Sequence, residues 1–354
     1  MIMKSKDWIK LFFISSAISV ILVGLINYII DPFQIYRKLT LYPFWYGGIK
    51  QERFHIAGLA KNYKYDSIVI GNSMTENFLI SDVNKLVPNS IKFCMLGARA
   101  YEIYIVLNYA YRYKKIKNVI LGLDIYGLTG DVKKIRSSIE FPFFLYDNNI
   151  FNDVKYLFSL DVLQESFDTI KKKHSHTKDK ILYQYEYMYE WQYLVKKKIS
   201  NKQIIDTWHN RLSPYNKKDW SFVKMKKSFS YNILSIIKKH PETKFYIFYP
   251  PYSFLVYKEW KEQGVLKDVL MLKKYIFDSL NSYNNVELYD FQVTKNIVFN
   301  LNNYKDSQHF YHSISSWIIK QMINKKYKVT KDNINSYINT LKEEFNESDK
   351  IIKG

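Results

Sequence analysis

The chain has 354 residues, and its 53 lysine and arginine residues outnumber 33 aspartate and glutamate residues, giving a formal net charge of +20. This length suffices for one large or two small domains with a sizeable core. The single cysteine, Cys94, excludes an intrachain disulfide and a cysteine zinc cluster, and we expect it in the core. The charge favours an anionic partner, although a general bias towards Lys, Asn, Ile and Tyr explains it equally well. No zinc-finger spacing or RNP-like motif supports nucleic acid.

An apolar run near the amino terminus predicts a transmembrane anchor. Residues 11–30 are about 20 mostly apolar positions bounded by Lys10 and Asp31, the length that crosses a bilayer. A cleaved signal peptide is the alternative, but the run is longer than a usual signal-peptide core and no clear small-x-small cleavage site follows it. A small excess of lysines in residues 1–10 places that segment in the cytoplasm and the rest of the chain outside a cell membrane crossed once.

The segment after the anchor, residues 31–61, is aromatic, is interrupted by proline and glycine, and is expected to be an irregular juxtamembrane connector. Five short, nearly continuous apolar runs follow, and such runs are typical of parallel strands covered on both faces. They cover residues 67–70, 91–95, 119–124, 244–249 and 286–290.

Helical patterns at residues 101–113, 222–239, 266–280 and 312–324 alternate with these runs. The alternation predicts an α/β domain over residues 62–326, a three-layer α/β/α sandwich around a five-stranded, mainly parallel sheet. Residues 127–215 interrupt this alternation of strands and helices. We expect them to form a largely helical insertion, which either caps the strand ends or does not touch them. Residues 327–354 predict a helical tail.

Ser73 is the candidate nucleophile. It follows the first predicted strand in Gly71-Asn72-Ser73, where we expect a helix to begin and to direct its amino terminus at a reacting carbonyl. A serine needs a base to take its proton and a third group to orient that base. Asp306 and His309, three residues apart, supply both. The structural alternatives are a helix cap for Ser73 or Asp306 and a surface histidine for His309.

The carboxyl ends of the predicted strands bring further residues to the same edge of the sheet, where open α/β sheets bind ligands. Asn72, Arg99, Asp124 and Tyr252 are the candidates for a substrate pocket, and Arg99 would hold a carboxylate or phosphate. Tyr252 stands in a Pro-rich segment that is equally consistent with a rigid turn. A metal pair of His309 with His312 lacks an evident third ligand, so no metal or other cofactor is predicted. The other histidines, among them His55, are expected at the surface.

Gly71-Asn72-Ser73 resembles the Gly-Asp-Ser block of the SGNH (GDSL-type) hydrolases, and Asp306-x-x-His309 resembles their terminal block. With the anchor, residues 66 to 325 are similar to the membrane-anchored branch for cell-envelope polymer acylation, which includes the D-alanyl-lipoteichoic acid transfer protein and the alginate O-acetylation proteins.

The resemblance implies a Ser73-His309-Asp306 triad and an oxyanion hole formed by the N–H groups of Ser73 and Gly97. Two positions depart from the family. Asn72 replaces its aspartate, and Asp124 stands where its third block has asparagine. The second change removes an oxyanion donor unless Asp124 is protonated or serves another role.

We therefore expect a membrane-anchored serine O-acyltransferase or esterase that modifies an extracellular polysaccharide or teichoic-type polymer through a Ser73 acyl-enzyme. The resemblance implies a polytopic membrane-bound O-acyltransferase as partner. Two alternatives remain open. One is a non-catalytic SGNH-like module that binds or presents an anionic envelope polymer, and the other is a cytoplasm-facing protein of lipid biosynthesis.

Overall fold

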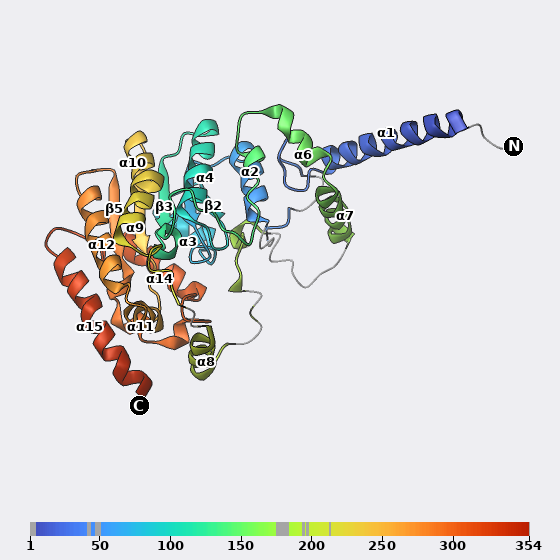
Figure 1. Cartoon of the computed structure of the whole chain (residues 1–354). Helices are drawn as coiled ribbons and strands as arrows, with labels where there is room; N and C mark the ends of the chain where they lie inside the picture. The colour runs from blue at the N-terminus through green and yellow to red at the C-terminus, as the bar shows by residue number, and fades with distance from the viewer. Residues whose placement is uncertain are drawn as a thin grey trace.

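The computed structural model describes residues 5–40, 44–46, 51–174, 184–192, 195, 198–211 and 214–353 (Figure 1). Its centre is a five-stranded, all-parallel sheet with the order β2-β1-β3-β4-β5. All five predicted strands are present, and their ends differ from prediction by two residues at most. The strands are β1 (Ser67–Gly71), β2 (Ser90–Cys94), β3 (Asn118–Gly122), β4 (Lys244–Tyr249) and β5 (Val286–Asp290).

The strands are apolar on both faces because both faces are covered. Every residue of β1 and β2 is buried, and Cys94 is part of the core as predicted. Lys92 in β2 is buried although its side chain is charged. Its ammonium donates to the carbonyls of Glu76 and Phe78 at 2.8 Å each, which offsets the cost of burying a charge.

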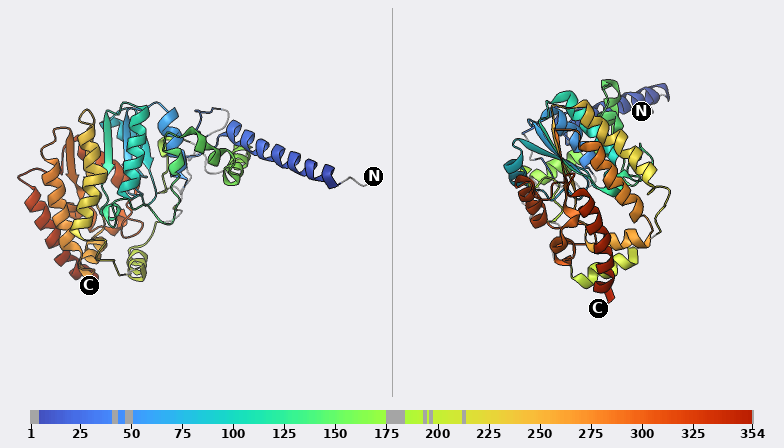
Figure 2. Two further views of the ribbon diagram at one scale, coloured as in Figure 1. Left: turned by 45° about the horizontal axis from the view of Figure 1, so that its top comes forward. Right: turned by 90° about the vertical axis from the view of Figure 1, so that its left-hand side faces the viewer.

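Two groups of helices pack beside the sheet, and the helices within each group contact one another (Figure 2). The larger group contains the predicted helix 222–239, which is present as two α-helices joined by a π-helical segment, Ser230–Leu234. The smaller group joins the segment after β1 to the segment after residues 306–309. The larger group is α4 (Ala100–Tyr113), α9 (Phe222–Phe229), α10 (Ser235–Lys239) and α12 (Leu266–Leu280), and the smaller is α3 (Ile80–Leu86) with α14 (His312–Ile323).

The expectation of an irregular connector over residues 31–61 is wrong for its last third. Helix α2 (Glu52–Asn62) packs on α4 and buries Ile56, Leu59 and Ala60 completely. These three positions share one helical face, so contact with α4 stabilises the helix even though the preceding residues are rich in breakers. Residues 41–43 and 47–50, which hold one of those prolines and both glycines, lie outside the described residues.

The described part of the insertion is helical only in places: it contains α-helices and short 3-10 turns, and residues 129–142 form turns and irregular structure. The predicted tail helix is present from residue 334 as α15 (Ile334–Lys353), which packs on α11 (Phe254–Glu262) and α12. The insertion contains α5 (Ile125–Leu128), α6 (Val154–Leu157), α7 (Leu160–His174) and α8 (Asn201–Arg211), and the remaining α-helices are α11 (Phe254–Glu262), α13 (Lys295–Val298) and α15 (Ile334–Lys353).

Helix α1 (Ser5–Ile30) extends away from the sheet, and most of its side chains are exposed (Figure 1). It has 26 residues, and its most apolar window has a mean hydropathy of 2.4. It is long and apolar enough to span a membrane, which agrees with the predicted anchor.

Candidate active site

The two remote motifs meet at the carboxyl edge of the sheet. Ser73 Oγ lies 2.7 Å from His309 Nε2, although 236 positions separate the two residues in the chain. His309 Nδ1 lies 2.9 Å from Asp306 Oδ2 on the other side of the ring. The ring therefore bridges a hydroxyl and a carboxylate, which is the arrangement that proton transfer from a serine requires.

The loop before α14 fixes the carboxylate of Asp306. Its Oδ1 accepts the backbone N–H groups of Gln308 and His309, both at 2.9 Å. Burial alone would raise the pKa of Asp306, but the adjacent His309 and these hydrogen bonds hold it well below its ordinary value. Asp306 is therefore ionised at neutral pH and favours a proton on Nδ1 of His309, which leaves Nε2 free to accept one.

The predicted helix directly after Ser73 is absent. Residues 73–77 form successive turns, and α3 begins only at Ile80, with Leu79 and not Ser73 as its cap. The side chain of Asn72 accepts the N–H of Met74 at 3.0 Å, and Thr75 Oγ1 donates to the Asn72 carbonyl at 2.7 Å. Such short polar side chains compete with helical hydrogen bonds. Stabilisation of an oxyanion must therefore come from individual N–H groups and not from a helix terminus at Ser73.

Two backbone N–H groups suit that role. Within the described part of the chain, the N–H groups of Ser73 and Gly97 donate to no protein acceptor. Gly97 has φ of +59°, a left-handed conformation that favours glycine. A Cβ at Gly97 would collide with the guanidinium of Arg136, so this cation lies directly against the glycine. Arg136 is not recognisable as a site residue from the sequence, because it belongs to the insertion and to no known motif.

Trp191, also from the insertion, touches both halves of the triad. Its indole N–H donates to the Ser73 carbonyl at 3.2 Å, and its ring meets the His309 ring edge to face at a centroid distance of 5.8 Å. Lys305 Nζ lies 3.9 Å from the Trp191 ring centroid. The insertion therefore covers the strand ends, and the alternative in which it does not touch the site is wrong. Only the aromatic character of this segment hinted at such a role.

Asp124 and Tyr252 lie behind Asn72 and Ser73 and do not line an open pocket. Asp124 accepts hydrogen bonds from the Asn72 amide, from the Tyr126 N–H at 3.0 Å and from the Tyr252 hydroxyl at 2.5 Å. Tyr252 is fully buried, and its bond to Asp124 satisfies a hydroxyl that would otherwise be costly to bury. The cavity beside Asn72 and Asp124 measures only about 10 Å³, too small for a substrate. Asp124 thus positions Asn72 and supplies no oxyanion donor.

The guanidinium of Arg99, the predicted anion ligand, bonds to the insertion. It donates to the carbonyl of Thr129 and, at 2.9 Å, to the hydroxyl of the same residue. Burial lowers the pKa of Arg99, and Asp124 opposes that shift. These bonds connect the start of α4 to Thr129 in the insertion. The cation that lies beside Gly97 is Arg136.

Two buried carboxyl groups lie near the Ser73 turn. Burial, with Glu52 nearby, raises the pKa of Glu76 to about 8, and burial raises that of Glu190 to about 7. The ammonium of Lys92 opposes both shifts. Glu190 Oε1 lies 3.3 Å from Nδ1 of His312, so the structure pairs His312 with a carboxylate and not with His309.

No protein-family model matches the chain, and no curated protein matches it significantly.

Proposed function

We propose that the protein is a membrane-anchored serine O-acyltransferase or esterase of the SGNH type. The observation that carries the proposal is the continuous arrangement of Ser73 Oγ, the His309 ring and the Asp306 carboxylate, with heavy-atom distances of 2.7 and 2.9 Å. These distances lie within the range for general-base catalysis. The triad comes from motifs in the order and at the strand ends that the SGNH resemblance implies.

In the proposed reaction, His309 Nε2 takes the proton of Ser73 while Oγ attacks an ester carbonyl. Asp306 stabilises the imidazolium, and the N–H groups of Ser73 and Gly97 stabilise the oxyanion. Collapse of the tetrahedral intermediate passes the proton to the leaving alcohol and leaves an acyl group on Ser73. His309 then deprotonates the incoming alcohol or water, which takes the acyl group and restores the serine.

Features around the triad support the proposed substrate class and location. Anchoring by α1 would hold the domain at the outer face of the membrane, where anionic or polysaccharide polymers are the available acceptors. The net charge of +20 and the position of Arg136 at Gly97 favour an anionic acceptor. A polytopic membrane-bound O-acyltransferase would deliver the acyl group, and the two helix groups would form the outer layers of an α/β/α sandwich.

Hydrolysis of a chromogenic acetyl ester by the full chain tests the proposal. We expect Ser73→Ala to abolish turnover. Ser313→Ala is the matched control, because Ser313 is an exposed serine on α14, and it should retain the wild-type rate. Equal turnover by wild type and Ser73→Ala would remove Ser73 from the mechanism.

One observation favours a non-catalytic polymer-binding module as the second candidate. Asp124 accepts the amide of Asn72, so the third-block donor that the SGNH family uses is missing. Such a module would bind an anionic polymer in a salt-sensitive manner and would keep that binding, and envelope acylation in cells, in a Ser73→Ala, His309→Ala double variant. Loss of cellular acylation in the double variant would reject it.

A further inference from the structure

An exposed apolar surface lies close to the base of α1. Outside α1, the described residues include eleven large apolar side chains that remain exposed, and five of them fall between residues 151 and 167. Phe151 is 81% exposed and Leu160 is 71% exposed. Exposed apolar side chains that gather in this way mark an interaction surface. We call residues 150–168 the apolar elbow, and its five exposed apolar side chains are Phe151, Val154, Phe158, Leu160 and Phe167.

The apolar elbow packs directly on the carboxyl-terminal part of α1 (Figure 2). Asn27 of α1 is fully buried, and its amide donates to the carbonyls of Leu157 and Ser159 at 2.8 and 3.0 Å. Gly24, one turn earlier, faces the Phe158 ring so closely that a Cβ would lie 2.7 Å from it. The inward face of α1 is therefore built for this contact.

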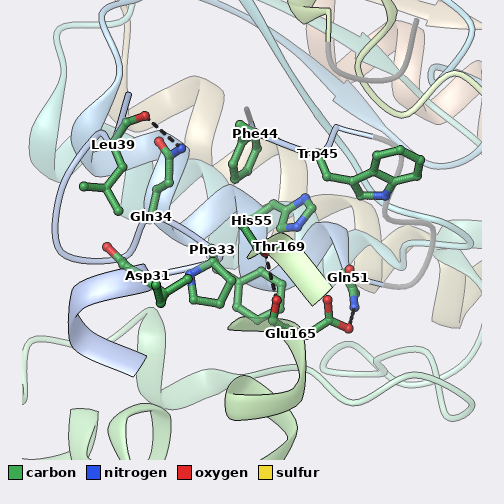
Figure 3. Close-up of a pocket in the computed structure, with 12 residues that line it drawn as sticks. Asp31, Phe33, Gln34, Leu39, Phe44, Trp45, Gln51, His55, Glu165 and Thr169 are labelled. Atoms are coloured by element: carbon green, nitrogen blue, oxygen red, sulfur yellow. Dashed lines mark hydrogen bonds between the residues drawn. The ribbon is translucent and has the colours of Figure 1, made fainter. Parts of the chain in front are cut away.

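The apolar elbow is also fastened to the sheet domain. Asp31 accepts the N–H of Ile35 at 2.9 Å, the N–H of Tyr36 at 3.0 Å and the hydroxyl of Tyr156 in α6 at 3.0 Å. Figure 3 shows a second link, in which Gln51, just before α2, bonds to Glu165 of α7.

The space enclosed between these links measures about 20 Å³. That volume holds little more than a water molecule, so the joint is not a ligand site. His55, expected at the surface, is buried here beside Phe44 and Phe33. Helix α1, the apolar elbow and the sheet domain are therefore tightly packed together at this place.

Membrane geometry places the elbow in the bilayer. If residues 11–30 cross the hydrocarbon core, Gly24 and Asn27 lie six and three residues before its outer boundary. At a rise of about 1.5 Å per residue, these positions are roughly 9 and 5 Å inside that boundary. A segment packed against them must enter the same leaflet. Its carbonyl partners also explain how Asn27 is tolerated there, because a polar group in lipid requires an internal partner.

We propose that the apolar elbow is a second membrane contact, embedded in the interfacial region of the leaflet in which the carboxyl end of α1 lies. Amphipathic segments of this kind lie about 5 to 10 Å deep at the headgroup boundary. Within the apolar elbow, the exposed charges of Lys155 and Asp161 are compatible with the headgroup boundary and not with the hydrocarbon centre. The proposal rests on α1 spanning the membrane, and it does not depend on catalysis at Ser73.

A polarity-sensitive dye tests the proposal in the full chain reconstituted into phosphatidylcholine–phosphatidylglycerol vesicles. The dye is attached to Leu160→Cys or to the matched control Val223→Cys, because these residues are 71% and 72% exposed. The native Cys94 is buried and will not react in the folded protein. We expect emission from position 160 to be blue-shifted and to be quenched several-fold more by nitroxide on the lipid acyl chains than emission from position 223.

Water-like emission at both positions, with equal quenching, would overturn the proposal. Blue-shifted emission at position 160 that lipid nitroxide does not quench would overturn it in favour of a protein partner on the elbow. Fluorophosphonate labelling of Ser73 in the same vesicles separates the two proposals. Labelling that persists while position 160 remains in water rejects the membrane contact alone.

Discussion

Replacement of Asp306 by asparagine should disable the base without removing it. Oδ1 of Asp306 accepts two backbone N–H groups at 2.9 Å, and Oδ2 lies 2.9 Å from Nδ1 of His309. The same two N–H groups will hold the carbonyl of the asparagine at the Oδ1 position. Its NH₂ group will then take the place of Oδ2, 2.9 Å from Nδ1, where its hydrogens oppose a proton on Nδ1 although the carbonyl oxygen lies 3.0 Å from the same nitrogen. We expect Nδ1 to become the acceptor and the ring proton to move to Nε2, which can then no longer accept the proton of Ser73.

The expected loss of rate is large because the predominant tautomer of His309 in the variant carries its proton on Nε2. Acylation of Ser73 should slow roughly 10³- to 10⁴-fold, which corresponds to about 4 to 5.5 kcal/mol of transition-state stabilisation. A fluorophosphonate reacts with the same Oγ and requires the same base, so the second-order rate constant for fluorophosphonate labelling of the full chain measures this loss. A decrease of less than about tenfold in a folded Asp306→Asn protein would refute the tautomer argument.

The same substitution carries a pH signature. The folded-state pKa of Asp306 lies below its ordinary value of 3.8, because His309 and the hydrogen bonds outweigh burial. A lowered carboxyl pKa stabilises the fold above the unfolded pKa, and this stability is lost as pH falls through the folded pKa. Asp306→Asn should therefore lower the free energy of unfolding at neutral pH, and its difference from wild type should shrink below about pH 4. A difference that stays constant down to pH 2 would contradict the assigned ionisation.

Three further substitutions test the surroundings of the triad. Trp191→Phe keeps a ring in place but removes the donor to the Ser73 carbonyl, so thermal unfolding should show a loss of about 1 kcal/mol and acylation should slow; unchanged values would show that the bond is dispensable. Gly97→Ala should reduce ester turnover strongly, because the new Cβ meets the guanidinium of Arg136 at a positive φ, and wild-type turnover would exclude Gly97 from the oxyanion hole. Glu76→Gln should stabilise the protein increasingly as pH rises from 4.5 towards 8, because burial raises the pKa of Glu76 and its ionisation opposes folding over that range; a pH-independent difference in denaturant unfolding would contradict this.

The sheet and the triad were predictable because both depend on simple rules. Strands covered on both faces are nearly continuously apolar, so β4 and β5 match the predicted ranges. Parallel strands end at one edge of the sheet, and residues that follow them converge whatever their separation in sequence. That rule places Ser73 at the edge of the sheet, and the segment after β5, which includes α13, carries His309 along the same edge to it.

Other features depend on contacts that leave no local pattern. The bond from Trp191 to Ser73 joins residues 118 positions apart, and the intervening insertion has no regular spacing. The turn after Ser73 depends on side-chain competition by Asn72 and Thr75, which the preference for a helix after a strand does not take into account. Tyr252 is buried because Asp124 offers it an acceptor, and that pairing is visible only once β3 and β4 are adjacent.

The central claim is that Ser73 becomes covalently acylated with His309 as its base. Peptide mass spectrometry of the full chain after treatment with a fluorophosphonate locates the reacting side chain directly. We expect a single adduct on the peptide that contains Ser73, and a strongly reduced yield of this adduct when His309 is replaced by glutamine. Absence of any adduct on Ser73, or an adduct of equal yield without His309, would contradict it.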